Sequence, residues 1–224
     1  MTDTRPTRFP RGVYGITPEW SDTDRLLQAV EQAADGGMKV LQWRRKTGDE
    51  KQRWAQAAAL REHCRKLGVL FIVNDSIEAA LRLDADGAHL GRDDGPLDTA
   101  RQALGSGRIL GTSCYNLPEL AARALKDDVD YVAFGAVYPS AVKPDAVRAT
   151  LEHIQEGRRL IALHESDQPS RVAVVAIGGI SADNAAPLVQ AGADSLAMIS
   201  GLFEVANIKD TAQRCTDLFA NHQA

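Results

Sequence analysis

The chain alternates between short apolar runs and longer segments in which apolar residues recur every three or four positions. The short runs are typical of β-strands buried on both faces, and the longer segments are typical of amphipathic helices. Strands are expected at residues 13–17, 40–46, 69–73, 87–90, 108–111, 131–135, 172–177 and 195–199. Helices are expected at residues 26–34, 54–66, 77–83, 97–104, 117–125, 149–165, 183–190 and 208–220. Side chains expected to cap these helices are Ser21 or Asp22, Thr47 or Asp49, and Asn116.

Eight strand-and-helix units follow one another with no strong linker between them. Such alternation implies parallel strands joined by right-handed crossovers. A doubly wound open sheet has the same alternation, but eight units in 224 residues favour a closed barrel. We therefore expect an α/β fold, a single-domain (β/α)8 TIM barrel spanning residues 12–224. Residues 1–11 are polar, contain Pro6 and Pro10, and are expected to form a flexible N-terminal tail.

Composition narrows the functional classes. The net charge of −4 argues against nucleic acid or an anionic membrane as a partner, so any anion site must be local. The three cysteines are widely spaced and fit neither a disulfide framework nor a zinc site, which favours a cytoplasmic location. No apolar run is long enough to span a bilayer, and the N-terminal segment lacks the apolar core of a signal peptide. The sequence carries no signal for an oligomeric state.

Polar residues gather where the expected strands end, which is where (β/α)8 barrels carry their active sites. Gln42, Arg44 and Lys46 alternate along one strand and share a face if the strand continues that far. Arginine and lysine at such a position suit a phosphate or pyrophosphate. In isolation, the same pattern is more often a solvated strand end.

Carboxylates follow the next strands. Asp75 and Asp94 come from adjacent strand ends, and two nearby carboxylates favour Mg²⁺. A helix cap at Asn74 and Asp75 is an equally good explanation of that pair. Gly178 and Gly179 allow close backbone approach to a phosphate, although a tight turn also needs glycine. His89 lies in an apolar neighbourhood and is interpreted as a satisfied core histidine rather than a base or ligand.

These motifs, taken in order, resemble the thiamine phosphate synthase family. The matching residues are Leu41, Gln42, Arg44 and Lys46; Val73–Asp75; Asp86–Gly91 with Asp94; Gly111–Ser113; Gly135 and Val137–Ser140 with Lys143; and Ala176–Ile180. Each motif is weak alone, but six in one order at strand ends are specific.

The resemblance implies an enzyme that joins 4-amino-2-methyl-5-hydroxymethylpyrimidine diphosphate to a thiazole ethyl phosphate, giving thiamine phosphate and pyrophosphate. It implies that both partners are small molecules and that Mg²⁺ is the cofactor, bound by Asp75 and Asp94. The residues it assigns to the pyrimidine diphosphate are Gln42, Arg44, Lys46 and Asn74, with Ser113 and Lys143 at the pyrimidine and its leaving group. Those it assigns to the thiazole phosphate are Ser140, Gly179, Ile199 and Ser200. Arg44, Lys46, Ser113 and Lys143 are the expected catalytic residues, and pyrophosphate is expected to depart before the thiazole nitrogen attacks.

The chain also departs from the family pattern. Val142 stands where a threonine is usual, Arg92 where a glutamine is common, and Ala136 where a proline is common. Two alternatives are a related thiazole tautomerase and a non-catalytic barrel that binds thiamine or phosphate. The tautomerase typically has a histidine shortly after the equivalent of Ser113, where this chain has Cys114, Tyr115 and Asn116. Retention of the two acidic positions also favours the synthase.

Overall fold

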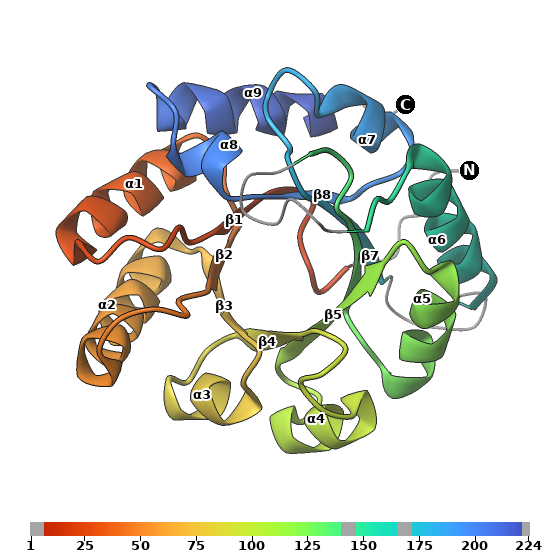
Figure 1. The fold of residues 1–224 in the computed structure, drawn as a ribbon, viewed down its shortest axis with the longest axis horizontal. Coiled ribbons are helices and arrows are strands. Elements are labelled where there is room, and N and C mark those ends of the chain that lie inside the picture. Colours follow the sequence, from red (N-terminus) through yellow and green to blue (C-terminus); the bar gives the residue numbers. More distant parts are fainter. Residues whose placement is uncertain (1–6, 140–146, 165–171, 221–224) are drawn as a thin grey trace.

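The computed structural model describes residues 7–139, 147–164 and 172–220 (Figure 1). Eight parallel strands form a closed barrel in sequence order, and β1 pairs with both β2 and β8. The strands are β1 Gly12–Ile16, β2 Val40–Trp43, β3 Leu70–Asn74, β4 Gly87–Leu90, β5 Ile109–Tyr115, β6 Tyr131–Gly135, β7 Ala173–Ile177 and β8 Ser195–Met198. The (β/α)8 barrel expected from the sequence is confirmed.

Helices surround the ring of strands, as Figure 1 shows. Within the described residues they are α1 Thr23–Asp35, α2 Glu50–Leu67, α3 Ile77–Arg82, α4 Leu97–Leu104, α5 Pro118–Ala124, α6 Leu151–His164, α7 Ala186–Gln190, α8 Ser200–Phe203 and α9 Ile208–Ala220, with a short 3₁₀ helix at Leu125–Asp127. None of the helices in this part of the chain is long and apolar enough to cross a membrane.

Two apolar layers hold the barrel together. The outer layer lies between strands and helices, and the inner one fills the barrel itself. Successive residues of a strand face opposite layers, so Val40 belongs to the inner cluster and its neighbour Leu41 to the outer one. Tyr14 and Tyr131 are the largest side chains inside the barrel, and both are buried.

The segment before β1 differs from the expected flexible tail. Phe9 is fully buried in the inner cluster, with its ring centroid 4.1 Å from that of Tyr131 and 5.2 Å from that of Tyr14. Arg8 pairs with Asp130, its Nη1 lying 3.1 Å from Oδ1. The prediction was wrong for residues 7–11 because the aromatic side chain of Phe9 packs inside the barrel with Tyr14 and Tyr131; residues 1–6 lie outside the described part.

Three aspartates form hydrogen bonds to neighbouring strands at the N-terminal end of the barrel. Each stands directly before an even-numbered strand and accepts the backbone N–H of the second residue of the preceding strand. The pairs are Asp86 with Phe71, Asp130 with Leu110, and Asp194 with Val174. Each carboxylate also pairs with an arginine, namely Arg61, Arg101 and Arg158 in the same order. These aspartate–arginine pairs therefore stabilise the fold, and they lie at the end of the barrel opposite the candidate site.

Local boundaries show where pattern alone misleads. Asp22 and Asp49 cap α1 and α2 as expected, each accepting from a backbone N–H three residues on. Asn116 does not cap α5, because β5 continues to Tyr115 through a bulge and the helix begins at Pro118 with no side-chain cap. The expected helix at 183–190 begins only at Ala186, and the short α8 was not expected.

Candidate active site

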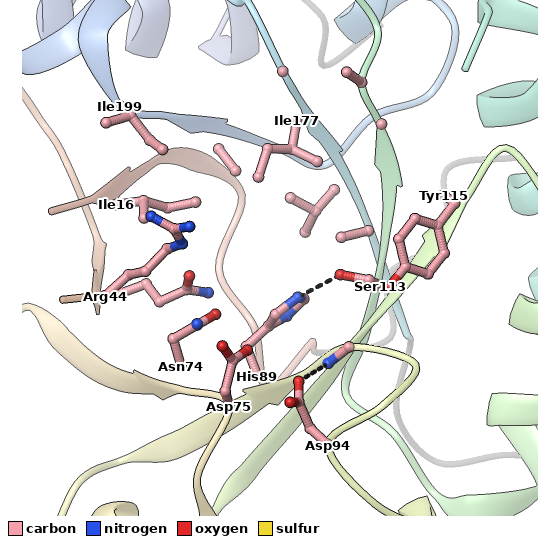
Figure 2. Close-up of a pocket in the computed structure, with 18 of the residues that line it drawn as sticks. Ile16, Arg44, Asn74, Asp75, His89, Asp94, Ser113, Tyr115, Ile177 and Ile199 are labelled. Atoms are coloured by element: carbon pink, nitrogen blue, oxygen red, sulfur yellow. Dashed lines mark hydrogen bonds between the residues drawn. The ribbon is translucent and has the colours of Figure 1, made fainter. Parts of the chain in front are cut away.

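A cavity of about 520 Å³ opens at the carboxyl ends of the strands, and residues on or just after all eight strands line it. This size suits a small-molecule ligand. The residues from β2 to β5 make one side polar, while Ile16, Ile177 and Ile199 make the other side apolar (Figure 2). The cavity therefore offers one wall for a charged group and another for an apolar ring.

The alternation that begins in β2 continues beyond the end of the strand. Gln42, Arg44 and Lys46 line the cavity, whereas Trp43 packs against the outer core. Regular β-structure stops at Trp43, yet the next residues keep the same alternation. The expectation that these three polar side chains share the pocket face is confirmed.

The two cations of this segment that line the cavity, Arg44 and Lys46, have acidic neighbours. Lys46 Nζ lies 3.1 Å from Asp75 Oδ2, and Arg44 Nη1 lies 3.4 Å from Glu19 Oε1. The guanidinium of Arg44 points into the cavity beside Ile16 and above Asn74 (Figure 2). Arg44 and Lys46 thus bring two positive side chains to this wall, and Arg92 also lines the cavity.

Two carboxylates lie beside those cations. Asp94 Oδ2 accepts the backbone N–H of Gly91 at 2.7 Å. Burial raises the pKa of Asp94, and the neighbouring Asp75 raises it further by hydrogen bonding and like charge, while the Gly91 N–H and Lys46 act in the opposite direction. A cation bound between the two carboxylates relieves this repulsion.

The donor set fits Mg²⁺ shared with a phosphate ligand. The described residues contain no cluster of three or more histidine, cysteine or acidic side chains that could enclose a metal. Mg²⁺ commonly uses only one or two protein carboxylates and completes its shell with water and substrate phosphates. Asp75 has a φ of 63°, a left-handed conformation that aspartate tolerates better than most residues.

A chain of hydrogen bonds runs through the barrel interior to the pocket. Gln42 Nε2 lies 2.6 Å from Tyr14 OH, which lies 2.8 Å from Tyr131 OH. Tyr131 OH is 2.9 Å from His89 Nδ1, and His89 Nε2 is 2.9 Å from Ser113 Oγ (Figure 2 shows the last of these). Because an amide nitrogen only donates, Gln42 donates to Tyr14, Tyr14 to Tyr131, and Tyr131 to His89 Nδ1. We therefore assign His89 as a neutral ring with its proton on Nε2, which donates to Ser113. Ser113 then accepts from His89, and its own O–H is left to donate.

The remaining predicted positions fall into three groups. Asn74 and Ile199 line the cavity. Gly179 and Ser200 do not; Gly178 lines it instead, and an added Cβ on Gly179 would lie 2.3 Å from the carbonyl oxygen of Pro139. Ser140, Val142 and Lys143 lie outside the described residues.

Several lining residues were not singled out from the sequence. Tyr14, Ile16 and Tyr115 are examples, and His89 was interpreted only as a core residue. Tyr14 and Ile16 alternate along β1 in the way that Gln42 and Arg44 do on the next strand, which is a signal that could have found them. Ser113 and Tyr115 alternate in the same way, with Cys114 between them in the outer core, so the same signal could have found Tyr115.

Comparisons with known proteins agree with this geometry. The family model described as thiamine monophosphate synthase matches residues 13–202. The chain belongs to this family. A thiamine-phosphate synthase of Bordetella pertussis is 53% identical over 213 residues, which cover 95% of this chain and 97% of that protein. One from Thiobacillus denitrificans is 48% identical over 212 residues, covering 95% and 96%. A solved thiamine phosphate pyrophosphorylase from Pyrococcus furiosus superposes with a TM-score of 0.77 at 30% identity, covering 95% of this chain and 97% of the other.

Thiamine-phosphate synthases are transferases, so the chain is an enzyme of this class. The family resemblance drawn from the strand-end motifs is thereby confirmed. A more distant likeness, to an orotidine 5'-phosphate decarboxylase at 12% identity and a TM-score of 0.67, concerns the barrel fold alone.

Proposed function

We propose that this cavity condenses 4-amino-2-methyl-5-hydroxymethylpyrimidine diphosphate with thiazole ethyl phosphate, in a reaction that requires Mg²⁺. The observation that carries the proposal is the pairing of two carboxylates, Asp75 and Asp94, with two cations, Arg44 and Lys46, on one wall of a single pocket. The opposite apolar wall suits the heterocyclic rings. We also propose a cytoplasmic location.

The residues have distinct roles in the proposed reaction. Asp75 and Asp94 would hold Mg²⁺, which when bound supplies positive charge to the departing pyrophosphate. Arg44 and Lys46 bind the diphosphate oxygens and stabilise the negative charge that accumulates as the bond to the pyrimidine methylene breaks. Ser113 donates its hydroxyl hydrogen to the pyrimidine substrate.

No general base is needed for bond formation. The C–O bond between the methylene carbon and pyrophosphate breaks first, and the electron-rich pyrimidine carries the resulting cation. The lone pair of the thiazole nitrogen then forms the new C–N bond, so the cationic charge moves onto that ring. We assign Gln42 and Asn74 to the diphosphate substrate and Lys143 to the leaving group. We assign Ser140, Gly179, Ile199 and Ser200 to the thiazole phosphate; Gly179 and Ser200 directly follow the lining residues Gly178 and Ile199.

A coupling assay tests this function. Purified protein is incubated with both substrates, and thiamine phosphate and pyrophosphate are measured together. We expect the two products in equal amounts with Mg²⁺, and neither when EDTA is present or one substrate is omitted. No product with both substrates and Mg²⁺ would refute the proposal, and isomerisation of the thiazole phosphate alone would favour the tautomerase alternative.

A further inference from the structure

The loop that carries the two pocket cations is held by the segment that follows β1. Thr17 is buried, and its hydroxyl both accepts the backbone N–H of Arg44 at 2.9 Å and donates to the carbonyl oxygen of the same residue at 3.1 Å. One side chain therefore satisfies both backbone polar groups of Arg44 at the point where β2 has ended.

Glu19 continues this contact along the loop. Its carboxylate accepts the backbone N–H of Lys46 at 3.2 Å, the N–H of Thr47 at 3.4 Å and the hydroxyl of Thr47 at 2.9 Å. It also lies 3.4 Å from Arg44 Nη1. The loop from Arg44 to Thr47 has no helical or strand hydrogen bonds of its own to fix its shape.

These contacts lie outside the pocket wall. Arg44 and Lys46 are among the residues that line the cavity, whereas Thr17, Glu19 and Thr47 are not. Glu19 is therefore not placed where a bound anion would sit, and most of its hydrogen bonds go to backbone and hydroxyl groups of the loop. This arrangement favours support of the loop over competition with an anion for Arg44.

We propose that Thr17 and Glu19 are positioning residues that hold the Arg44–Thr47 loop in the shape that receives the diphosphate. The inference rests on the proposed function, since it takes the anion bound by Arg44 and Lys46 to be a diphosphate. A loop fixed before binding loses less conformational entropy when the anion binds, so its support appears as affinity. Neither residue touches the substrate.

Paired variants distinguish the loss of the Thr17 and Glu19 hydrogen bonds from a general loss of structure. Thr17→Val removes the hydroxyl and keeps the size, and Thr17→Ser restores the hydroxyl. Glu19→Ala removes every contact of the carboxylate, while Glu19→Gln keeps an acceptor but loses the charge. Glu31→Gln, on an exposed position of α1, makes the same change in net charge away from the pocket and serves as the control.

Two measurements are made on each full-length variant. Calorimetry gives the dissociation constant of pyrophosphate in saturating Mg²⁺, and steady-state kinetics give KM for each substrate. We expect Thr17→Val and Glu19→Ala to weaken pyrophosphate about tenfold, or ~1.4 kcal/mol, and to raise KM for the diphosphate substrate in step. Glu19→Gln should show a smaller change, and KM for the thiazole phosphate should stay within about twofold in every variant. Thr17→Ser and Glu31→Gln should behave as the unaltered protein.

The outcomes distinguish this inference from the proposed function. If the unaltered protein neither binds pyrophosphate nor forms product, the proposed function fails. If it does both and the Thr17 and Glu19 variants bind pyrophosphate as tightly, the positioning role is wrong. Tighter binding by Glu19→Gln would show that Glu19 competes with the anion, and equal losses for both substrates would indicate general structural damage; either result overturns the inference.

Discussion

Removing one buried hydroxyl should interrupt the hydrogen-bond chain that crosses the barrel interior. Tyr131 is fully buried, and its OH lies 2.8 Å from Tyr14 OH and 2.9 Å from His89 Nδ1. Tyr131→Phe keeps the ring that packs on Phe9 but removes one hydrogen bond from the Tyr14 hydroxyl and one from His89 Nδ1. The loss of a partner at a buried polar group costs ~1–3 kcal/mol, so losses at two such groups should lower the free energy of unfolding by ~2–6 kcal/mol.

Urea unfolding of the two proteins measures this difference. Tyr138→Phe is the matched control, because it removes a tyrosine hydroxyl that makes one hydrogen bond within the described residues, 2.9 Å to the carbonyl oxygen of Asn184, at a partly buried position. We expect the control to lose ~1 kcal/mol. A loss below ~0.5 kcal/mol for Tyr131→Phe, with an unchanged m-value, would refute the reasoning.

The same variant tests the direction of the chain. Nitrogen-15 NMR of His89 should show a neutral ring with the proton on Nε2 in the unaltered protein, and a mixture of tautomers in Tyr131→Phe. Protonation of Nδ1 in the unaltered protein would reverse the assignment and remove the argument that Ser113 has its own hydrogen to donate.

Three further predictions concern other parts of the molecule. Arg44→Ala should raise KM for the diphosphate substrate by about tenfold or more while leaving KM for the thiazole phosphate within about twofold, and equal losses would contradict the site assignment. Asp130→Asn should lower the free energy of unfolding by ~3 kcal/mol, because Arg101 loses a buried partner 2.7 Å away, whereas Asp128→Asn, at an exposed carboxylate, should change it by less than ~0.5 kcal/mol. Burial raises the pKa of the Cys64 and Cys114 thiols from an ordinary 9.0 to about 12, and that of the Cys215 thiol to about 11. A thiol reagent at pH 8 should therefore label none of these three cysteines until the protein unfolds. Since the unfolded chain releases these protons first, stability should fall as pH rises from 9.0 towards 11, and a stability that rises in that range would be the opposite of this expectation.

The barrel fold and the charged wall of the site could be predicted from the pattern of residues along individual strands. Two-residue alternation places Gln42, Arg44 and Lys46 on one face, and it does so even though β2 stops at Trp43. The rule that sites lie at the carboxyl ends of strands then brings Asp75 and Asp94 to the same pocket. Both inferences need only the order of residues along one or two elements.

Contacts between distant elements were not visible in this way. Phe9 lies in a polar segment, and only the closed barrel shows that its ring fills the interior. The sequence places Thr17 at the end of a strand and gives no signal for Glu19, because the partners of both residues lie about 27 positions further along the chain. The bulge in β5 was likewise not visible, because it shows only in the pairing of β5 with β6; β5 extends to Tyr115, and α5 begins at Pro118 without a side-chain cap.

The most direct test of a shared metal and diphosphate site is the linkage between the two ligands. Pyrophosphate is titrated calorimetrically into the unaltered protein with and without Mg²⁺, and the same is done with Asp94→Asn. We predict that Mg²⁺ tightens pyrophosphate binding by about tenfold or more, that pyrophosphate tightens Mg²⁺ binding by the same factor, and that Asp94→Asn abolishes this coupling. Equal pyrophosphate affinity with and without Mg²⁺, or coupling that survives in Asp94→Asn, would contradict the account.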